Sequence, residues 1–554
     1  MSEAGPVEAS PVGSNAAGAE QPGIVDSLVI AVIVALLVKA FVLEAFVIPT
    51  GSMAPTLLGQ HIRFHSPQTG ANWAVAPWHY ADSSRQLPRP VQGRVVRNGE
   101  VVRADDNPRS DDPVTTPGPH RDLGFEVGGD RPMPLRAGDR ILIAKAAYAL
   151  RDPQRYEVAV FKNPTSVQQN FIKRIVGVPG EQVWLVDGDV YTRPAPQGDG
   201  ADAPIRGAAD EGWAIRRKPA GVQRAVWRTV FSSEFTPLDV IGDVSPAWWR
   251  CPWVGDGWDT SARAYTFAGD GPAELRWDID WWPMTDWEPY NDVPGRRYRR
   301  DPFPVSDVRV RAGIEPLGDG PLRVELQLET RGMTFSARLA REPDGHVTAS
   351  LAHELHDLHD SPSAPMVDTE PSSSVLRPGV ITNVTFEHVD QQVRLVVNGE
   401  TLATHQYELA PADRITAVTG LDDPMTALLD DPGAYVRSAP RLTWRFDAGP
   451  LRLHRVGVDR DLYYRPEGDR GVHPDRVVTL GGDDFFALGD NSANSEDGRD
   501  WRRVDPAVES AFDPELGVVP RRLLLGRALF VYFPSPVTRG PIPVPDFGRM
   551  RAIK

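Results

Sequence analysis

The sequence predicts a mainly β protein in which a β-sandwich is inserted into a second β domain, behind one apolar helix. Turn-forming residues are abundant, with 49 glycines and 53 prolines among 554 residues, which favours turns and short strands over long helices. Apolar and polar residues alternate in many short runs, as they do in half-buried strands. The hydrophobic share of 41% is typical of globular proteins, and the length indicates two or three domains.

The most apolar stretch lies near the N-terminus, behind a small, polar and acidic tail at residues 1–23 that we expect to be disordered and cytoplasmic. The stretch runs from Ile24 to Ile48, and as a helix it would extend about 37 Å, more than the roughly 30 Å of a bilayer core. We therefore expect residues 24–46 to form a transmembrane helix, with an interfacial or buried helix as the alternative. No Lys or Arg precedes the stretch, so charge does not support a cytoplasmic N-terminus.

Changes in composition divide the rest of the chain. Residues 84–135 are rich in Arg, Pro, Asp and Gly and lack periodicity, which predicts an insertion or long loop. Short apolar runs predict strands in 47–83, 136–222 and 461–554, which we expect to form one discontinuous domain. Strands spaced by about ten residues within 223–460 predict the inserted β-sandwich, jelly-roll-like in type.

The clearest strand signals lie in the predicted sandwich. Apolar residues alternate with polar ones in LRVELQLE (322–329) and in TFSARLA (334–340). The runs ITNVTFEHV (381–389) and QQVRLVV (391–397) are followed by Asn398-Gly399, the dipeptide that most strongly indicates a two-residue hairpin turn.

Charge and cysteine content exclude several classes of function. The net charge of −15 argues against a general nucleic-acid-binding protein, and the single cysteine, Cys251, excludes an internal disulfide or a cysteine metal site. HELHDLH (353–359) contains three histidines but lacks the HExxH pattern, so we interpret these as surface histidines and expect no metal or other cofactor. Tryptophans gather between residues 248 and 287, where core packing is a commoner use than a binding platform.

A serine and a lysine are the candidate reactive pair. Ser52 lies in FVIPTGSMAPTL (46–57), where two prolines and a glycine disfavour helix and leave a small hydroxyl on a turn. A serine is a poor nucleophile unless a base takes its proton. Lys173 is suited to that task, because in FIKRIV it shares a strand face with Phe171 and Ile175, and burial lowers the pKa of an amine.

Four blocks resemble bacterial type I signal peptidases, which cut signal peptides from exported proteins with a serine–lysine dyad. They occur in the order found in that family, behind the apolar stretch, and cover little more than a quarter of the chain. The blocks are PTGSMAPTL (49–57), GDRILIAK with EVAVFKNP (138–145 and 157–164), FIKRIVGVPGE (171–181), and FFALGDNSANSEDGRDW (485–501) with GRALFVYFP (526–534).

The resemblance implies roles for six residues. Ser52 would be the nucleophile and Lys173 the general base, with an oxyanion hole from the Ser52 N–H and the Thr50 hydroxyl. Ser495 would orient the lysine, and an ion pair of Asp497 and Arg499 would support the site from beneath. Two departures from the family pattern are present: Gly498 stands where serine is common, and Ser492-Ala493 replace a more usual Arg-Asp pair.

The same resemblance implies the biological setting. A signal peptidase acts on preprotein signal peptides with small residues at the cleavage site, in contact with the lipid bilayer and in the neighbourhood of the export machinery. We therefore expect a single-pass protein of the cell membrane with its catalytic domain on the extracytoplasmic face. Two alternatives are a self-cleaving serine–lysine peptidase and a catalytically inactive, membrane-tethered lectin-like protein on the same scaffold.

The predicted insertion is similar, over about twenty residues, to the hairpins of laminin-G or concanavalin-like sandwiches. All six candidate residues lie outside 223–460, and the flanks at 195–222 and 461–475 are rich in Pro, Gly, Asp and Arg. Because such composition is typical of boundaries that few contacts cross, we expect the insertion to be dispensable for chemistry.

Overall fold

The computed structural model describes residues 24–37, 42–65, 69–76, 91–92, 94–97, 100–104, 123–126, 132–133, 135–196, 212–237, 250–291, 302–355, 367–369, 375–421, 423, 426–428, 439–512, 514–539 and 542–554. The expected tail at 1–23, residues 38–41 of the expected helix and most of 84–135 lie outside the described residues. The prediction of a mainly β protein is confirmed.

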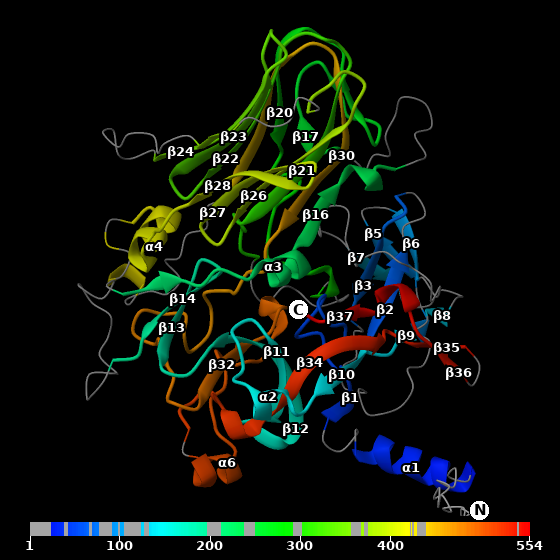
Figure 1. The fold of residues 1–554 in the computed structure, drawn as a ribbon, viewed down its shortest axis with the longest axis vertical. Helices are drawn as coiled ribbons and strands as arrows, with labels where there is room; N and C mark the ends of the chain where they lie inside the picture. The colour runs from blue at the N-terminus through cyan, green and yellow to red at the C-terminus, as the bar shows by residue number, and fades with distance from the viewer. Residues whose placement is uncertain are drawn as a thin grey trace, which may run out of the picture.

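An eight-stranded antiparallel sheet forms the centre of the body, which lies below the sandwich in Figure 1. In spatial order its strands are β1 (Leu43–Val47), β10 (Arg140–Ala144), β34 (Leu524–Phe533), β11 (Val158–Asn163), β12 (Ser166–Gly177), β32 (Asp484–Leu488) and β33 (Val519–Pro520), with β37 (Arg551–Ala552) beside β34. Val158 and Val160 of β11 pack in one apolar cluster, and Ala159 and Phe161 pack in another. Both faces of this strand are therefore covered, which explains its continuous apolar run.

Smaller sheets complete the body. One contains β15 (Ala214–Ile215), β14 (Asp189–Pro194), β13 (Glu181–Val186) and β31 (Val478–Thr479). Another contains β3 (Asn72–Val75), β2 (His61–His65), β6 (Glu100–Ala104), β5 (Arg94–Arg97), β7 (Leu123–Glu126) and β9 (Leu135–Arg136). Two pairs are β4 (Val91–Gln92) with β8 (Pro132–Met133), and β35 (Val537–Arg539) with β36 (Ile542–Val544). Where it is described, 84–135, expected to be an insertion or long loop, contains short strands.

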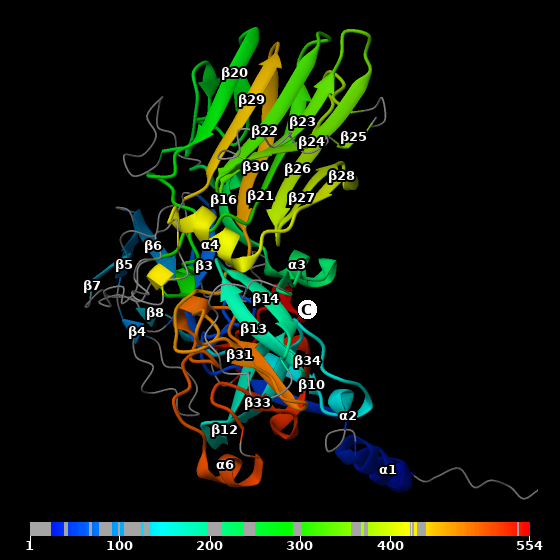
Figure 2. The ribbon, with the colours of Figure 1, turned by 90° about the vertical axis from the view of Figure 1, so that its left-hand side faces the viewer.

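Two antiparallel sheets pack face to face in the inserted sandwich, which occupies the opposite end of the long axis from the body (Figures 1 and 2). The first contains β18 (Trp258–Asp259), β19 (Tyr265–Phe267), β30 (Leu451–Arg460), β21 (Val308–Pro316), β26 (Thr382–Val389), β27 (Gln392–Val397) and β28 (Glu400–Gln406), with β16 (Arg228–Ser232) beside β30. The second contains β17 (Trp253–Val254), β20 (Gly271–Trp277), β29 (Arg441–Ala448), β22 (Leu322–Thr330), β23 (Met333–Arg341), β24 (Val347–Leu355) and β25 (Val367–Thr369).

The alternating runs form sandwich strands with one face in the core. In β22 every second residue from Leu322 to Thr330 is buried. Val397 pairs with Glu400 across Asn398-Gly399, and both turn residues have positive φ, so the predicted hairpin is confirmed. Trp253, Trp277 and Trp282 lie in the sandwich core. His353 lies on β24, whereas His356 and His359 lie outside the described residues.

The N-terminal helix is shorter than the sequence predicts. Helix α1 covers Ile24–Leu37, and Leu43–Val47 forms strand β1, paired with β10 from Leu43↔Ala144 to Val47↔Arg140. The prediction that residues 43–46 belong to a helix is therefore wrong, because an apolar run does not by itself distinguish a helix from a buried strand. Among the described residues, no helix has the length and apolar character needed to cross a membrane.

The other helices whose bounds lie within the described residues are short. They are α2 (Ala147–Leu150), α3 (Ala220–Val226), α4 (Pro411–Thr419) and α6 (Pro506–Phe512), with 3-10 turns η4 (Ser233–Phe235), η5 (Pro289–Asn291), η7 (Ser492–Asn494), η8 (Arg521–Leu523) and η9 (Phe547–Arg549). Helix α4 begins with a proline in its first turn and ends at Gly420, whose φ of 68° is the left-handed conformation that glycine adopts easily.

Buried charges join the sandwich to the body, so the expectation that few contacts cross this boundary is wrong. The side chains of Asp189, Asp307, Asp390 and Asp461 converge, with one oxygen of each within 4.8 Å of the others. Lys218 contacts Asp390 and Asp461, while Arg414 donates to Asp189 at 2.7 Å and Arg331 donates to Asp307 at 2.7 Å. Lys218–Asp390 thus connects the segment around 218 with the sandwich, and Arg414–Asp189 connects the sandwich with β14, although the segment around 218 reads as a linker in the sequence.

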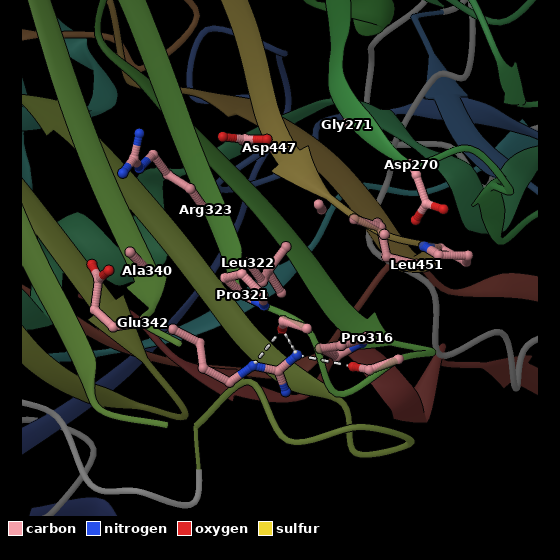
Figure 3. A pocket seen from close by; sticks show the side chains of 16 residues that line it. Asp270, Gly271, Pro316, Pro321, Leu322, Arg323, Ala340, Glu342, Asp447 and Leu451 are labelled. Atoms are coloured by element: carbon pink, nitrogen blue, oxygen red, sulfur yellow. Dashed lines mark hydrogen bonds between the residues drawn. The ribbon is translucent and has the colours of Figure 1, made fainter. Parts of the chain in front are cut away.

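A pocket of about 360 Å³ opens at the end of the sandwich that lies away from the body (Figure 3). Its lining includes Pro316 at the end of β21 and Leu451 at the start of β30. The opposite ends of these strands, Val308 and Arg460, face the body. The length of the sandwich therefore separates this pocket from the candidate active site.

Candidate active site

Ser52 lies on a compact turn that follows β1. The Ala54 N–H donates to the Gly51 carbonyl and the Leu57 N–H donates to the Met53 carbonyl, each at 2.9 Å. Met53, Ala54 and Leu57 are buried, whereas Ser52 is half-buried. Apolar neighbours thus anchor the turn and leave the serine at its accessible side.

The loop after β32 contacts this turn through main-chain atoms. The Asn491 N–H donates to the Ser52 carbonyl at 3.0 Å, and the Asn491 side-chain amide donates to the Gly51 carbonyl at 2.9 Å. A Cβ atom at Gly489 would lie 2.2 Å from Ser495 Oγ and 2.4 Å from the Ser52 carbonyl oxygen. Because glycine lacks a Cβ atom, position 489 allows the Ser52 carbonyl oxygen and the Ser495 hydroxyl to approach its Cα together.

Lys173 is buried, with 3% of its surface exposed, on strand β12. Its Nζ donates to Ser495 Oγ at 2.9 Å and lies 5.5 Å from the centre of the Phe171 ring. Burial lowers the pKa of Lys173 to about 8, although the nearby carboxylate of Asp497 acts in the opposite direction. A substantial fraction of this amine is therefore neutral near physiological pH, as a general base requires.

Asp497 and Arg499 form a buried bidentate ion pair behind the lysine. Nε and Nη2 of Arg499 each lie 2.9 Å from an Asp497 oxygen, and Asp497 also accepts from the Gly489 N–H at 3.0 Å. The arginine and the Gly489 N–H hold the pKa of Asp497 below its usual value despite burial. The pair thus holds a fixed negative charge near Lys173 and supports the loop that carries Ser495.

Both departures from the family pattern have a structural reason. A Cβ atom at Gly498 would lie 2.5 Å from the Gly517 carbonyl oxygen and 2.6 Å from the Phe486 ring, so the position has no room for serine without rearrangement. Ser492 accepts hydrogen bonds from Arg499 Nη1 at 2.8 Å and from the Arg465 N–H at 2.9 Å. Its small side chain thereby links the ion pair to the segment after the insertion.

A second buried ion pair was missed in the sequence. Arg174 donates two hydrogen bonds to Asp490, at 2.8 and 2.7 Å, and both side chains are fully buried. Thr56 of the Ser52 turn donates to the same carboxylate. The signal was present, since Arg174 follows Lys173 on the opposite face of a strand that has apolar residues on both sides, and a charged residue there requires a partner.

The remaining candidate groups are the hydroxyls of Thr50 and Ser52. Thr50 is exposed, two residues before Ser52. Within the described part of the chain, no hydrogen bond joins Ser52 Oγ to Lys173 Nζ, and the lysine donates to Ser495 instead. Catalytic hydrogen bonds are often long in unliganded enzymes and shorten when substrate binds, so this geometry is compatible with a dyad.

The insertion reaches the Ser52 turn, which sequence reasoning also missed. Tyr290 and Asn291 of η5 contact Gly51 and Asn491, and Arg228 of β16 donates to Thr56 Oγ1 at 2.7 Å. The expected separation between the insertion and the site is therefore wrong. No sequence pattern indicates these contacts, because they join segments about 200 residues apart.

The arrangement is suited to proton transfer from a hydroxyl to an amine, and the site as described has no set of metal ligands. The four converging aspartates lie at the domain boundary instead, where Lys218 and two arginines already supply positive charge.

Part of the chain matches a known protein family. Residues 127–211 match the family described as signal peptidase, peptidase S26. This segment contains Lys173, whereas Ser52 and Ser495 lie outside it. The match supports that peptidase family for this segment.

Curated relatives match short stretches of this chain. Probable signal peptidase I-2 of Synechocystis is 46% identical over 63 residues, 10% of this chain and 28% of the relative. Signal peptidase I of Pseudomonas aeruginosa is 40% identical over 72 residues, 11% of this chain and 25% of the relative. Signal peptidase I of Leptolyngbya laminosa is 31% identical over 94 residues, 16% of this chain and 44% of the relative. The chain therefore spans less than half the length of each of these relatives.

Solved structures resemble the chain only weakly. The carbohydrate-binding module CBM66 of Bacillus subtilis has a TM-score of 0.22 and 8% identity, covering 38% of this chain and 95% of the module. The galectin LEC-6 of Caenorhabditis elegans has a TM-score of 0.18 and 12% identity, covering 28% of this chain and 83% of the galectin. Scores this low carry no argument about the inserted sandwich.

Proposed function

We propose that the protein is a serine endopeptidase of the signal peptidase I type, which removes signal peptides from exported preproteins. The observation that carries this proposal is the buried Lys173 amine. It is hydrogen-bonded to Ser495 and lies in a segment that matches peptidase S26, and Gly489 allows Ser495 and Ser52 to converge. A buried lysine with a lowered pKa beside an accessible serine hydroxyl is the chemical requirement for a serine–lysine dyad.

In the proposed mechanism, the neutral amine of Lys173 takes the proton from Ser52 Oγ as that oxygen attacks the scissile carbonyl. Ser495 holds the amine in place, and the ion pair of Asp497 and Arg499 supports the Ser495 loop. The Ser52 N–H and the Thr50 hydroxyl would stabilise the negative charge that develops on the carbonyl oxygen. The lysine then returns its proton to the leaving amine, and water releases the acyl group by the reverse sequence.

We also propose that α1 associates the enzyme with the bilayer in which its substrates are presented. Leu28, Val29, Ile30, Val32 and Ile33 expose between 50% and 64% of their surfaces. A contiguous set of exposed apolar side chains on one helix is unfavourable in water and is typical of a surface that binds lipid or protein.

The test of the proposed function is preprotein cleavage by purified protein, with sequencing of the new N-terminus. Ser52→Ala, Lys173→Ala and Lys173→Arg should each reduce turnover by at least about 10³-fold, and the double alanine variant should be scarcely worse than either single one. Arginine should fail because it keeps its proton. Lys145→Ala is the control, since that lysine is one-third exposed in a surface ion pair with Glu44.

Normal turnover by any of the three dyad variants would contradict the assignment of Ser52 and Lys173. Cleavage at a site without small residues would contradict the proposed substrate class.

A further inference from the structure

The η5 turn of the inserted sandwich packs directly on the residue before Ser52. Tyr290 is 1% exposed, and a Cβ atom at Gly51 would lie 1.9 Å from its ring. Its hydroxyl donates to the Gln60 carbonyl at 2.6 Å, just beyond the Ser52 turn, and its carbonyl accepts from the Ala76 N–H at 2.9 Å. The ring thus covers Gly51 while its polar groups bind main-chain atoms of the body.

Asn291 continues the contact on the other side of the turn. Its side-chain amide exchanges two hydrogen bonds with that of Asn491, each at 2.8 Å, and its oxygen also accepts from Asn494 at 3.2 Å. Asn491 in turn donates to the carbonyls of Gly51 and Ser52. Asn291 therefore orients the residue that holds the peptide groups on both sides of the Ser52 Cα, the first of which contains the Ser52 N–H.

Buried ion pairs fix the η5 turn itself. Glu288 pairs with Arg460 at the end of β30, and Asp286 pairs with Arg465, whose N–H donates to the Ser492 hydroxyl. All four side chains are less than 6% exposed. Arg228 lies 3.5 Å from Glu288 and donates to Thr56 on the Ser52 turn. Because ion pairs hold the segment just before the turn to both Arg460 and Arg465, the turn transmits the position of the sandwich to residues 51 and 52.

We propose that Tyr290 and Asn291 are positioning residues for the reaction, so that the insertion completes the active site. This inference rests on the proposed function, because it assigns the two side chains to placing Ser52 against Lys173. Neither side chain touches the reacting atoms; they act through Gly51 and Asn491. Small displacements of a reacting group reduce turnover strongly, so loss of these contacts should lower kcat and leave KM little changed.

The first measurement is steady-state cleavage of a preprotein by Asn291→Ala and Tyr290→Phe. Each should lower kcat by about tenfold or more with KM within about twofold. Tyr290→Phe keeps the ring on Gly51 and removes only the hydrogen bond to Gln60, so it remains informative if Asn291→Ala folds poorly. The matched control is Asn383→Ala, which removes an exposed asparagine on β26 of the same sandwich.

The second measurement places a thiol at position 52 and does not require preprotein cleavage. Cys251 is the single cysteine, so Ser52→Cys with Cys251→Ser gives a chain with one thiol. Alkylation by iodoacetamide across pH reports the pKa of that thiol, which a neighbouring Lys173 should hold below the ordinary value of about 8.5. Asn291→Ala in this background should raise the thiol pKa toward that value and slow alkylation at pH 7 by about threefold or more. Asn383→Ala should not.

The outcomes distinguish the proposed dyad from the positioning role of Tyr290 and Asn291. A parent thiol with an ordinary pKa would contradict the dyad and, with it, the positioning role. A lowered parent pKa that Asn291→Ala and Tyr290→Phe both leave unchanged, together with normal kcat, would overturn the positioning role alone. If Asn291→Ala shifts the thiol pKa but the protein cleaves no preprotein, the positioning role would be supported and the proposed substrate contradicted.

Discussion

Lys173 is 3% exposed, its amine donates a hydrogen bond to Ser495, and the carboxylate of Asp497 is the charge that most strongly favours the protonated amine. The folded-state pKa of about 8 lies below the unfolded value near 10.5. Below pH 8 the amine is charged in both states and the folded state bears the full cost of burying it. Above pH 10.5 it is neutral in both states and the cost disappears.

We therefore expect Lys173→Met to be more stable than the wild type at neutral pH. The pKa difference corresponds to about 3 kcal/mol in the free energy of unfolding at pH 7, and this advantage should decline between pH 8 and 10.5 as the wild type gains stability. Denaturant unfolding of both proteins across that range is the measurement.

Lys145→Met is the control, because Lys145 is one-third exposed in a surface pair and should give a difference below about 1 kcal/mol. A Lys173→Met variant that is less stable than the wild type at pH 7 would show that the amine is well solvated or fully paired in the fold.

At the scale of elements, the end of β32 determines how closely the Ser52 turn and the Ser495 loop approach each other. The strand pairs with β12 through Arg174↔Leu488 and Ile175↔Ala487, which places Gly489 directly after the register that positions Lys173. A Cβ at 489 would meet the Ser52 carbonyl oxygen and the Cβ and Oγ atoms of Ser495. The first belongs to the main chain, so it has little freedom to move aside.

Gly489→Ala should therefore separate Ser52 from Ser495. We expect turnover to fall by about 10²-fold and the free energy of unfolding to fall by about 1–3 kcal/mol, the usual cost of overpacking. Preprotein cleavage and thermal unfolding are measured on the same preparation. Gly482→Ala is the matched control, since a Cβ atom there would meet no atom within 4 Å. Equal activity of the two alanine variants would contradict the close approach.

At the scale of the whole molecule, the sandwich and the body contribute to one cluster of buried charges, and residues of both contact the Ser52 turn. Burial and the neighbouring Asp307 raise the pKa of Asp189 to about 7, whereas Arg331 and His388 hold the pKa of Asp307 below its usual value. Removing one side of such a cluster leaves charges unpaired in the other, which is strongly destabilising. We therefore expect excision of the sandwich to destabilise the body, contrary to the expectation that the insertion is dispensable.

The orientation expected of the proposed signal peptidase is tested on the whole molecule. We predict that residues 52–554 lie on the outer face of the cell membrane, because preprotein cleavage sites emerge there. Protease added to intact spheroplasts should degrade this part of the chain while a cytoplasmic marker protein stays intact. Protection of the C-terminal part until the cells are lysed would contradict this orientation.

Local chemistry in the sequence was sufficient to predict the class of fold, the sandwich strands and the candidate dyad. Period-two alternation in β22 and the Asn398-Gly399 turn are properties of neighbouring residues, so they can be read without knowing what packs against them. Only the tertiary structure decided that Leu43–Val47 is a strand, that Arg174 pairs with Asp490, and that Tyr290 and Asn291 contact the Ser52 turn. The physical reason is distance along the chain: an apolar run, a buried arginine and a turn asparagine each need a partner, and those partners lie about 100, 316 and 200 residues away.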